Sequence, residues 1–172
     1  MILSRDRIRS EIGKNIHIIP FSEEKLNSNS YNLTLSDKLL VYQHAQLDMK
    51  IQEPTNEIII PSTGYVLQPG ELYLGSTIET TKTEKFIPII EGRSSIARLG
   101  LFVHITAGLG EAGFDGHWTL ELCCVKPLRI YPHVSICQIY YHEISGTPCL
   151  CDSQKYQNSQ TAEGSKLYTE FL

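Results

Sequence analysis

Short runs of β-forming residues, separated by turn-forming residues, limit most strongly how this chain can fold. Tyr31, Leu33 and Leu35 alternate with polar residues, which is typical of a strand with one buried face. Further strand-like runs are found at positions 58–60, 66–67, 73–74, 87–90, 128–131 and 134–144, and turn-forming residues flank most of them. The pattern predicts a mainly β protein, built as a sandwich or a barrel.

One helix is predicted near the N-terminus, over residues 5–12. Ser4 is a candidate cap, Ile8 and Ile12 fall on one face, and Gly13 is a candidate stop. The same region is charged and holds no apolar run of the length of a signal peptide or a membrane span. We therefore expect a cytoplasmic protein with no membrane partner.

The composition sets weaker limits on function. The chain has 172 residues, of which 41% are hydrophobic, enough for one domain with a real core. Its formal net charge of -4 argues against a general nucleic-acid or anionic-membrane surface. A small anionic substrate needs only a local basic pocket, which Arg93, Arg98 and Lys155 can supply.

The segment 91–121 combines residue types that suit a bound anion. Arg93 precedes a pair of serines that can cap a short helical turn over about 95–99, ended by Gly100. Free N–H groups at such a helix start attract phosphate, and the glycines that follow allow close approach of backbone to a ligand. Each feature alone is an ordinary cap or turn, but together they favour an anion site.

Glu121 is the strongest candidate for a catalytic residue. In the strand-like run WTLELCC the apolar side chains fall on one face, whereas Glu121 falls on the other with Thr119 and Cys123. A carboxylate among apolar neighbours must be solvated, paired or used in chemistry. The structural alternative is an ion pair between Glu121 and Arg98.

A zinc site is not predicted. Many nucleobase deaminases hold zinc with an HxE segment and a PCxxC segment. Here Cys149 and Cys151 form CxC, and His142 and Glu143 are adjacent. The six histidines are scattered and no CxxC pair is present, so we expect no zinc.

Several motifs resemble the dCTP deaminase family, part of the dUTPase-like group of trimeric nucleotide enzymes. GRSSIARLGL, VHITAG and AGFDGHWTLEL carry the resemblance, and SYNLTL, LQPGELYLGSTIE and KYQNSQ fall in the family's order. The likeness covers most of the chain, with gaps around 42–62 and at the extreme C-terminus. It implies one domain over 1–172 with a distorted β-barrel or jelly-roll-like, dUTPase-type fold, assembled as a homotrimer with active sites between subunits.

The resemblance also implies roles for individual residues. Glu121 would shuttle protons, Ser94 would hold the attacking water, and Arg98 would orient Glu121. The implied nucleotide contacts are Arg93, Ser95, Ala107, Gly108, Glu111, Lys155, Tyr156 and Gln160. Mg²⁺ would arrive on the nucleotide triphosphate, held mostly by phosphate oxygens and water.

The polar segment 146–172 has two interpretations. Composition alone predicts a frayed terminus. The resemblance instead implies a flexible lid that orders over the nucleotide. The tail departs from the family at Thr161, Ala162 and Glu163, where a Gly and then a Pro/Ser-containing stretch are usual.

The implied reaction is hydrolytic deamination of dCTP to dUTP and ammonia. Gly108 stands where family members that stop at dUTP often have a bulkier residue such as His, which favours continuation to dUMP and diphosphate. Gly110 and Glu111 replace the usual apolar residue and Asp. The added methylene of Glu111 can misplace the water that would attack the α-phosphate in the second step. Gly110, which has no side chain, can offset this by leaving space for the longer residue. The sequence favours the bifunctional form narrowly.

Two alternatives remain at this point. The first is a dUTP diphosphatase only, favoured by the TAG motif but opposed by the absence of its Gly-rich, Phe-containing C-terminal motif. The second is a non-catalytic trimeric nucleotide-binding regulator. It is disfavoured because Ser94, Arg98 and Glu121 are all present.

Overall fold

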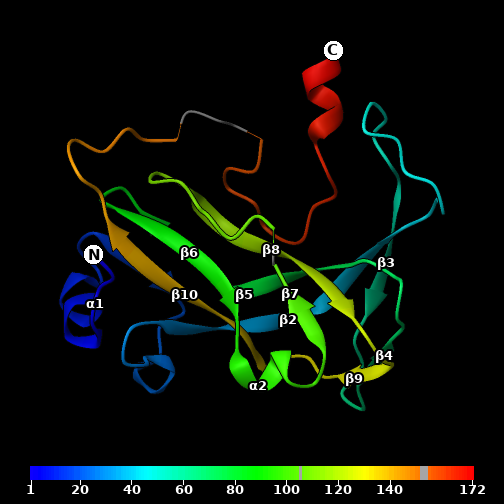
Figure 1. Cartoon of the computed structure of the whole chain (residues 1–172), viewed down its shortest axis with the longest axis horizontal. Coiled ribbons are helices and arrows are strands. Elements are labelled where there is room, and N and C mark those ends of the chain that lie inside the picture. The colour runs from blue at the N-terminus through cyan, green and yellow to red at the C-terminus, as the bar shows by residue number, and fades with distance from the viewer. Residues whose placement is uncertain (105, 152–154) are drawn as a thin grey trace.

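A computed structural model describes residues 1–104, 106–151 and 155–172. Its strands form one antiparallel path and a small separate ribbon (Figure 1). The path runs β6 (Phe86–Gly92), β10 (Ser135–Glu143), β2 (Tyr31–Tyr42), β5 (Tyr73–Thr83), β8 (Asp115–Cys124), β7 (Leu101–Val103). β1 (Ile16–Ile19) joins β5 and β3 (Thr55–Ile59) joins β2, while β4 (Tyr65–Leu67) pairs with β9 (Leu128–Ile130).

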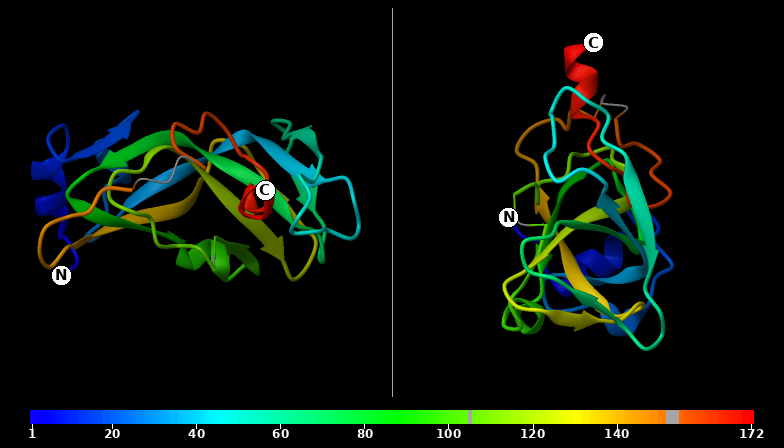
Figure 2. Two further views of the ribbon diagram at one scale, coloured as in Figure 1. Left: turned by 90° about the horizontal axis from the view of Figure 1, so that it is seen from above. Right: turned by 90° about the vertical axis from the view of Figure 1, so that its right-hand side faces the viewer.

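The six-stranded path curls into a nearly closed barrel, as the right-hand view of Figure 2 shows. Its two end strands approach each other, because a Cβ on Gly92 would lie 3.8 Å from Cβ of Val103. The alternation at Tyr31, Leu33 and Leu35 is confirmed, since these three side chains are fully buried. The prediction of a mainly β, barrel-like fold is therefore confirmed.

The N-terminal helix is close to its predicted bounds. α1 (Arg5–Glu11) ends one residue early, the Ser4 side chain accepts a hydrogen bond from Arg7 N at 3.4 Å, and Ile8 is fully buried. Gly13 has φ +75°, a conformation that favours glycine. Among the described residues, no helix combines the length and the apolar character needed to cross a membrane.

The second predicted helix differs from its expected form. α2 (Ser94–Ala97) begins at the first serine, and its N-cap is Arg93 without a side-chain cap hydrogen bond. The serine pair therefore lies inside the helix and does not cap it. Gly100 does end the turn with φ +80°, where a Cβ would also collide with Val125 Cγ2 at 2.4 Å. Two short 3-10 helices, η1 (Glu23–Lys25) and η2 (Leu167–Phe171), have too little periodicity to be predicted.

The C-terminal tail is not frayed, which corrects the interpretation from composition. Asn158 N donates to Asp115 O at 2.7 Å and His117 N donates to Ser159 O at 3.0 Å, so the tail pairs with the start of β8. Gly116 permits this approach, because a Cβ there would lie 2.9 Å from Ser159 N. Of the predicted lid 146–172, residues 152–154 lie outside the described part of the chain.

A buried ion pair joins three elements on one side of the barrel. Glu79 of β5 is fully buried, and its carboxylate lies 2.6 Å from Lys25 Nζ of η1. The same carboxylate accepts hydrogen bonds from the backbone N–H and the hydroxyl of Thr34 on β2, both at 2.8 Å. Because each oxygen has a partner, the charge is tolerated in the interior.

We expect Glu79→Ala to lower the free energy of unfolding by about 3 kcal/mol, because it removes the charge partner of Lys25 and leaves the buried Thr34 N–H without its acceptor. The exposed pair Lys38–Glu57, with 3.1 Å between its charged atoms, provides a matched control. Glu57→Ala should change stability by less than about 1 kcal/mol. Urea unfolding of both variants measures this, and equal losses would contradict a special role for Glu79.

Candidate active site

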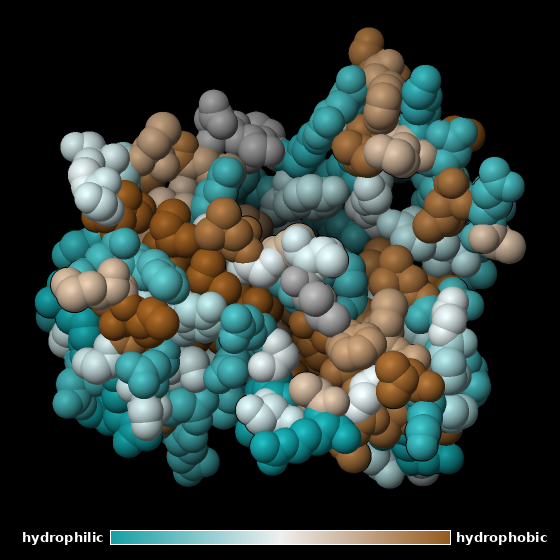
Figure 3. Space-filling model, viewed as in Figure 1, coloured by the Kyte–Doolittle hydropathy of each residue, from teal (hydrophilic) through white to brown (hydrophobic). Residues whose placement is uncertain are grey.

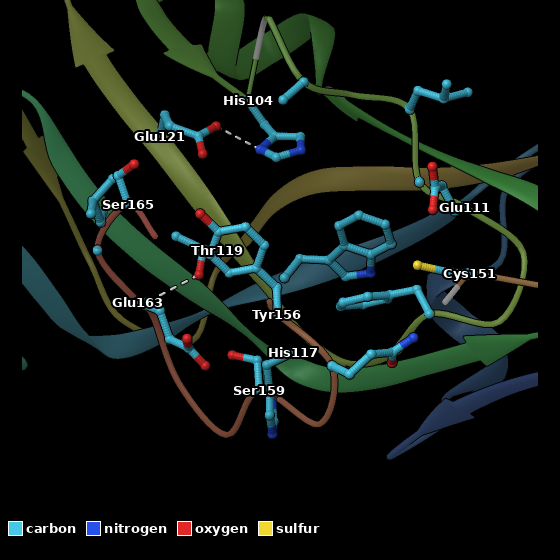
Figure 4. Close-up of a pocket in the computed structure, with 18 of the residues that line it drawn as sticks. His104, Glu111, His117, Thr119, Glu121, Cys151, Tyr156, Ser159, Glu163 and Ser165 are labelled. Carbon is cyan, nitrogen blue, oxygen red and sulfur yellow. Dashed lines mark hydrogen bonds and ion pairs between the residues drawn. The ribbon is translucent and has the colours of Figure 1, made fainter. Parts of the chain in front are cut away.

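β8 places Glu121 at a cavity. Buried and half-buried side chains alternate along the whole strand, so Thr119, Glu121 and Cys123 lie on the face opposite the core, as predicted. A cavity of about 590 Å³ lies beside this face, under the tail. Its lining, shown in Figure 4, includes His104, Glu111, Phe114, Trp118, Glu121 and Tyr156.

The carboxylate of Glu121 contacts His104, a residue that the sequence did not single out. His104 Nδ1 lies 2.7 Å from Glu121 Oε2, as the dashed line in Figure 4 marks. The two atoms are in close contact but do not form a well-directed hydrogen bond. His104 is only 7% exposed, and its Nε2 has no hydrogen-bond partner among the described residues.

Backbone geometry fixes His104 beside Glu121. His104 follows β7, where Val103 pairs with Leu122, and its N–H donates to Glu121 O at 2.9 Å. Its φ of +52° is unusual for a residue with a side chain, and it accompanies the turn of the ring toward the carboxylate. This pairing was missed because the two residues are far apart in sequence, and only the β7–β8 register brings them together.

The environment of Glu121 acts on its pKa in two directions. Burial raises the pKa of Glu121, because the interior disfavours a charged carboxylate. Contact with the His104 ring and the electrostatic effect of that ring lower the pKa of Glu121, and the net effect is a pKa below the usual value. Glu121 is therefore ionised at neutral pH and can accept a proton.

The cavity brings together some of the predicted site residues. Glu121, Ala107, Glu111 and Tyr156 all line it. The other predicted residues do not line this cavity in their own chain: Arg93, Ser94, Ser95, Arg98, Gly108, Lys155 and Gln160. α2, which carries Ser94 and Ser95, lies at the lower edge of Figure 1 beside β7, whereas the tail crosses the upper side.

Several of these residues have local partners. The expected contact of Arg98 with Glu121 is not found within the chain, where His104 takes that place. Arg93 Nη1 donates to Ser135 O at 2.8 Å. Lys155 pairs with Glu170, and Gln160 Nε2 donates to Asn158 O at 2.9 Å.

Two glycines near the cavity have packing reasons of their own. A Cβ on Gly108 would lie 2.7 Å from Ile90 O, and the Ile90 N–H donates to Gly108 O at 2.8 Å. A Cβ on Gly110 would lie 2.3 Å from Trp118 Cη2. The space at Gly110 is therefore filled by the indole of Trp118 and is not available to Glu111, in contrast to our expectation.

No group of three or more His, Cys, Asp or Glu side chains suited to hold a metal ion is found within the described ranges. Cys149 is exposed and Cys151, which lines the cavity, is half-buried. Three carboxylates line the cavity: Glu111, Glu121, which contacts His104, and Glu163, which pairs with Lys166.

The fold is similar to that of two solved nucleotide enzymes. The 2'-deoxycytidine 5'-triphosphate deaminase from Agrobacterium tumefaciens superposes with a TM-score of 0.66 at 19% identity, over 83% of this chain and 48% of that one. This chain thus spans about half the length of that protein. A mutant form of the dUTPase from phage 80alpha gives a TM-score of 0.50 at 14% identity, over 84% of this chain and 99% of that one.

The chain belongs to the dCTP deaminase-like family, whose model matches residues 2–144. It is 56% identical to a "dCTP deaminase, dUMP-forming" of Clostridium botulinum (strain Alaska E43 / Type E3), over 99% of both chains. Similar proteins of the same name come from Clostridium acetobutylicum, at 53% identity over 100% of this chain and 99% of the other, and Cytophaga hutchinsonii, at 51% over 99% of both. The resemblance seen in the motifs is confirmed.

We expect His104→Gln to raise the pKa of Glu121, because burial still raises that pKa while the contact and electrostatic effect of the His104 ring are lost. Carbon NMR titration of the labelled glutamate carboxyl measures this directly. Since the folded pKa is lowered, Glu121 adds stability above its unfolded pKa, and that stability is lost as pH falls through the folded value. The variant should lose less stability on acidification, whereas His142→Gln on β10 should behave like the wild type. An unchanged Glu121 titration would show that His104 does not control it.

Proposed function

We propose that this protein is a dUMP-forming dCTP deaminase, which converts dCTP and two waters to dUMP, ammonia and diphosphate. The observation that carries this is an ionised Glu121 at the cavity of a chain that is 56% identical, almost end to end, to a protein of that name. The product supplies pyrimidine deoxynucleotide synthesis. The family membership argues against the alternatives of a dUTP diphosphatase only and of a non-catalytic regulator.

Glu121 carries the proton traffic of the deamination in this proposal. Its carboxylate takes a proton from the water that attacks C4 of the cytosine ring, passes a proton to N3, and helps the amino nitrogen leave as ammonia. Proton shuttling of this kind contributes about 10² to 10⁴ in rate. Glu121 is ionised at neutral pH, so the residue can accept the first proton of the cycle.

His104 serves as the positioning residue for Glu121. The ring lies 2.7 Å from the carboxylate and makes an edge contact with Trp118, at 6.2 Å between ring centroids. The backbone of His104 is fixed by the hydrogen bond from its N–H to Glu121 O. A carboxylate held in one orientation loses less freedom in the transition state. This contact supplies within the chain what the sequence assigned to Arg98.

Ser94 and Arg98 act from a neighbouring chain of a homotrimer in this proposal, with Ser94 holding the water and Arg98 steadying charge near Glu121. Their absence from the lining of their own chain's cavity supports it. Leu99, Phe102 and Val125, next to α2, are each about half exposed and form an apolar patch that association would cover (Figure 3).

The remaining predicted contacts bind the nucleotide. Arg93 and Ser95 reach the phosphates from the neighbouring chain, while Lys155, Tyr156 and Gln160 act from the tail. Ala107 and Gly108 offer backbone groups to the base. The triphosphate brings Mg²⁺, whose ligands are mostly its own oxygens and water.

Glu111 takes the place of the usual Asp in the second step, in which water attacks the α-phosphorus and diphosphate leaves. Glu111 lines the cavity, so its carboxylate lies within the site despite the longer side chain. The longer side chain of Glu111 is an argument against the second step, because it can displace the attacking water. The relatives named dUMP-forming support the bifunctional interpretation instead. Glu111→Asp should keep or raise the rate of diphosphate release.

Incubation of the purified protein with dCTP and Mg²⁺, followed by separation of the products, tests the function. We expect one dUMP and one diphosphate for each dCTP, with no added transition metal. Accumulation of dUTP without diphosphate would show a deaminase only. Consumption of dUTP but not dCTP would show a diphosphatase only.

We expect Glu121→Gln to abolish turnover while nucleotide affinity stays within about tenfold, because the phosphates are held elsewhere. Ser94→Ala should also be nearly inactive. If the site lies between subunits, mixed trimers of the two variants should regain activity at about a quarter of their sites, where each partner supplies an intact half. No recovery after subunit exchange would place the whole site in one chain.

A further inference from the structure

The tail crosses the cavity in a stretch that has no strand partner. Residues 163–166 are outside any helix or strand, yet their backbone N–H groups still need acceptors. Side-chain hydroxyls provide three of them. Glu163 N donates to Thr119 Oγ1 at 3.1 Å, Ser165 N to the Tyr42 hydroxyl at 2.8 Å, and Lys166 N to the Tyr156 hydroxyl at 2.9 Å.

These three hydroxyls belong to the cavity itself. Thr119, Tyr42 and Tyr156 all line it, and Figure 4 shows Thr119 and Tyr156 between the tail and the carboxylate of Glu121. Thr119 lies two positions before Glu121 on β8, whereas Tyr42 is the last residue of β2. The tail is therefore fastened to two different strands of the barrel at the rim of the site.

Tyr42, at the end of β2, contacts the tail through more than its hydroxyl. A Cβ on Gly164 would lie 3.7 Å from the Tyr42 ring and from Thr55 Cγ2, so the tail packs closely on β2 and β3. Further along, Lys50 Nζ lies 5.5 Å from the centroid of the Phe171 ring. The adjacent ends of β2 and β3 thus contact the tail at Gly164, and the connection between these strands contacts it at Phe171.

The charges of this segment are paired within the tail. Lys166 pairs with Glu163 and lies 5.2 Å from the centroid of the Tyr156 ring, and Lys155 pairs with Glu170. The three bonds that hold residues 163–166 join neutral N–H groups to neutral hydroxyls. Salt should therefore weaken them little, although it weakens contacts with phosphate.

We propose that Tyr42 is a positioning residue that, together with Thr119 and Tyr156, latches the tail over the cavity and so sets nucleotide affinity. The inference rests on the proposed function for the identity of the nucleotide, and the latch itself is made within the chain. A tail held near its working position has less conformational freedom to lose when the nucleotide binds. Removing one acceptor should therefore weaken binding and leave the chemical step intact.

Tyr42→Phe removes only the hydroxyl that accepts the Ser165 N–H. Loss of one hydrogen bond corresponds to about a two- to tenfold change in an equilibrium constant. We expect hydrogen exchange of the 163–166 segment, measured by mass spectrometry, to quicken by about that factor. The KM for dCTP should rise by a similar factor, while kcat stays within about twofold, at both low and high salt.

Tyr140→Phe is the matched control, because the Tyr140 hydroxyl donates to Glu91 Oε1 at 3.1 Å on β6 and does not line the cavity. It should change neither exchange nor KM. If Tyr42→Phe raises KM without faster exchange at 163–166, the hydroxyl contacts the nucleotide and the latch is overturned. Unchanged exchange and unchanged KM overturn it as well.

The exchange measurement also separates this inference from the proposed function, because it requires no turnover. If the protein does not turn over dCTP but exchange at 163–166 is still faster in Tyr42→Phe, the latch is supported and the proposed deaminase function is contradicted. Thr119→Val provides a second test if Tyr42→Phe does not fold, with Thr119→Ser as the conservative variant. Exchange at 163–166 should quicken in Thr119→Val and return toward the wild-type rate in Thr119→Ser, and equal rates would overturn the proposal.

Discussion

The two-residue alternation of β8 is the constraint on which the rest of the molecule depends. Leu120 and Leu122 point into the core and are fully buried, while Thr119 and Glu121 point toward the cavity. β5 and β7 pair with this strand from either side and fix its register. A shift of one residue would exchange the two faces, so that a carboxylate would enter the core and a leucine would face the site. Core packing therefore holds the acid in place.

Two carboxylates on neighbouring strands differ in their side-chain partners, and this difference distinguishes a structural role from a chemical one. Glu79 is fully buried and each of its oxygens is satisfied by Lys25 or Thr34, which leaves it no capacity for a substrate. Glu121 has one close side-chain partner, His104, and its side chain keeps 38% of its exposure. The lowered pKa of Glu121 then comes from a group that is itself at the cavity, so the same contact sets both orientation and charge.

Patterns of local origin were predictable from the sequence, and pairings across the barrel were not. The alternation at Tyr31 to Leu35 and at Glu121 was readable because a strand repeats every two residues. The helix at 5–12 was placed within one residue because its cap and its glycine are adjacent to it. His104 escaped notice because only the register of β7 with β8 brings it to Glu121. The order of the tail was not predicted from composition for the same reason. Its hydrogen-bond partners include residues 42 and 115–119, which are distant in sequence, as well as Tyr156.

The close approach of Ser159 to Gly116 joins the tail to the strand that carries the acid. Gly116 and Glu121 stand on one strand, and β5 and β7 pair with that strand independently of the tail. Changes in the tail sequence should therefore alter which nucleotides are retained, and for how long, without altering the chemistry applied to them. Retention of the nucleotide and the breaking of bonds can thus be tuned through separate sets of residues.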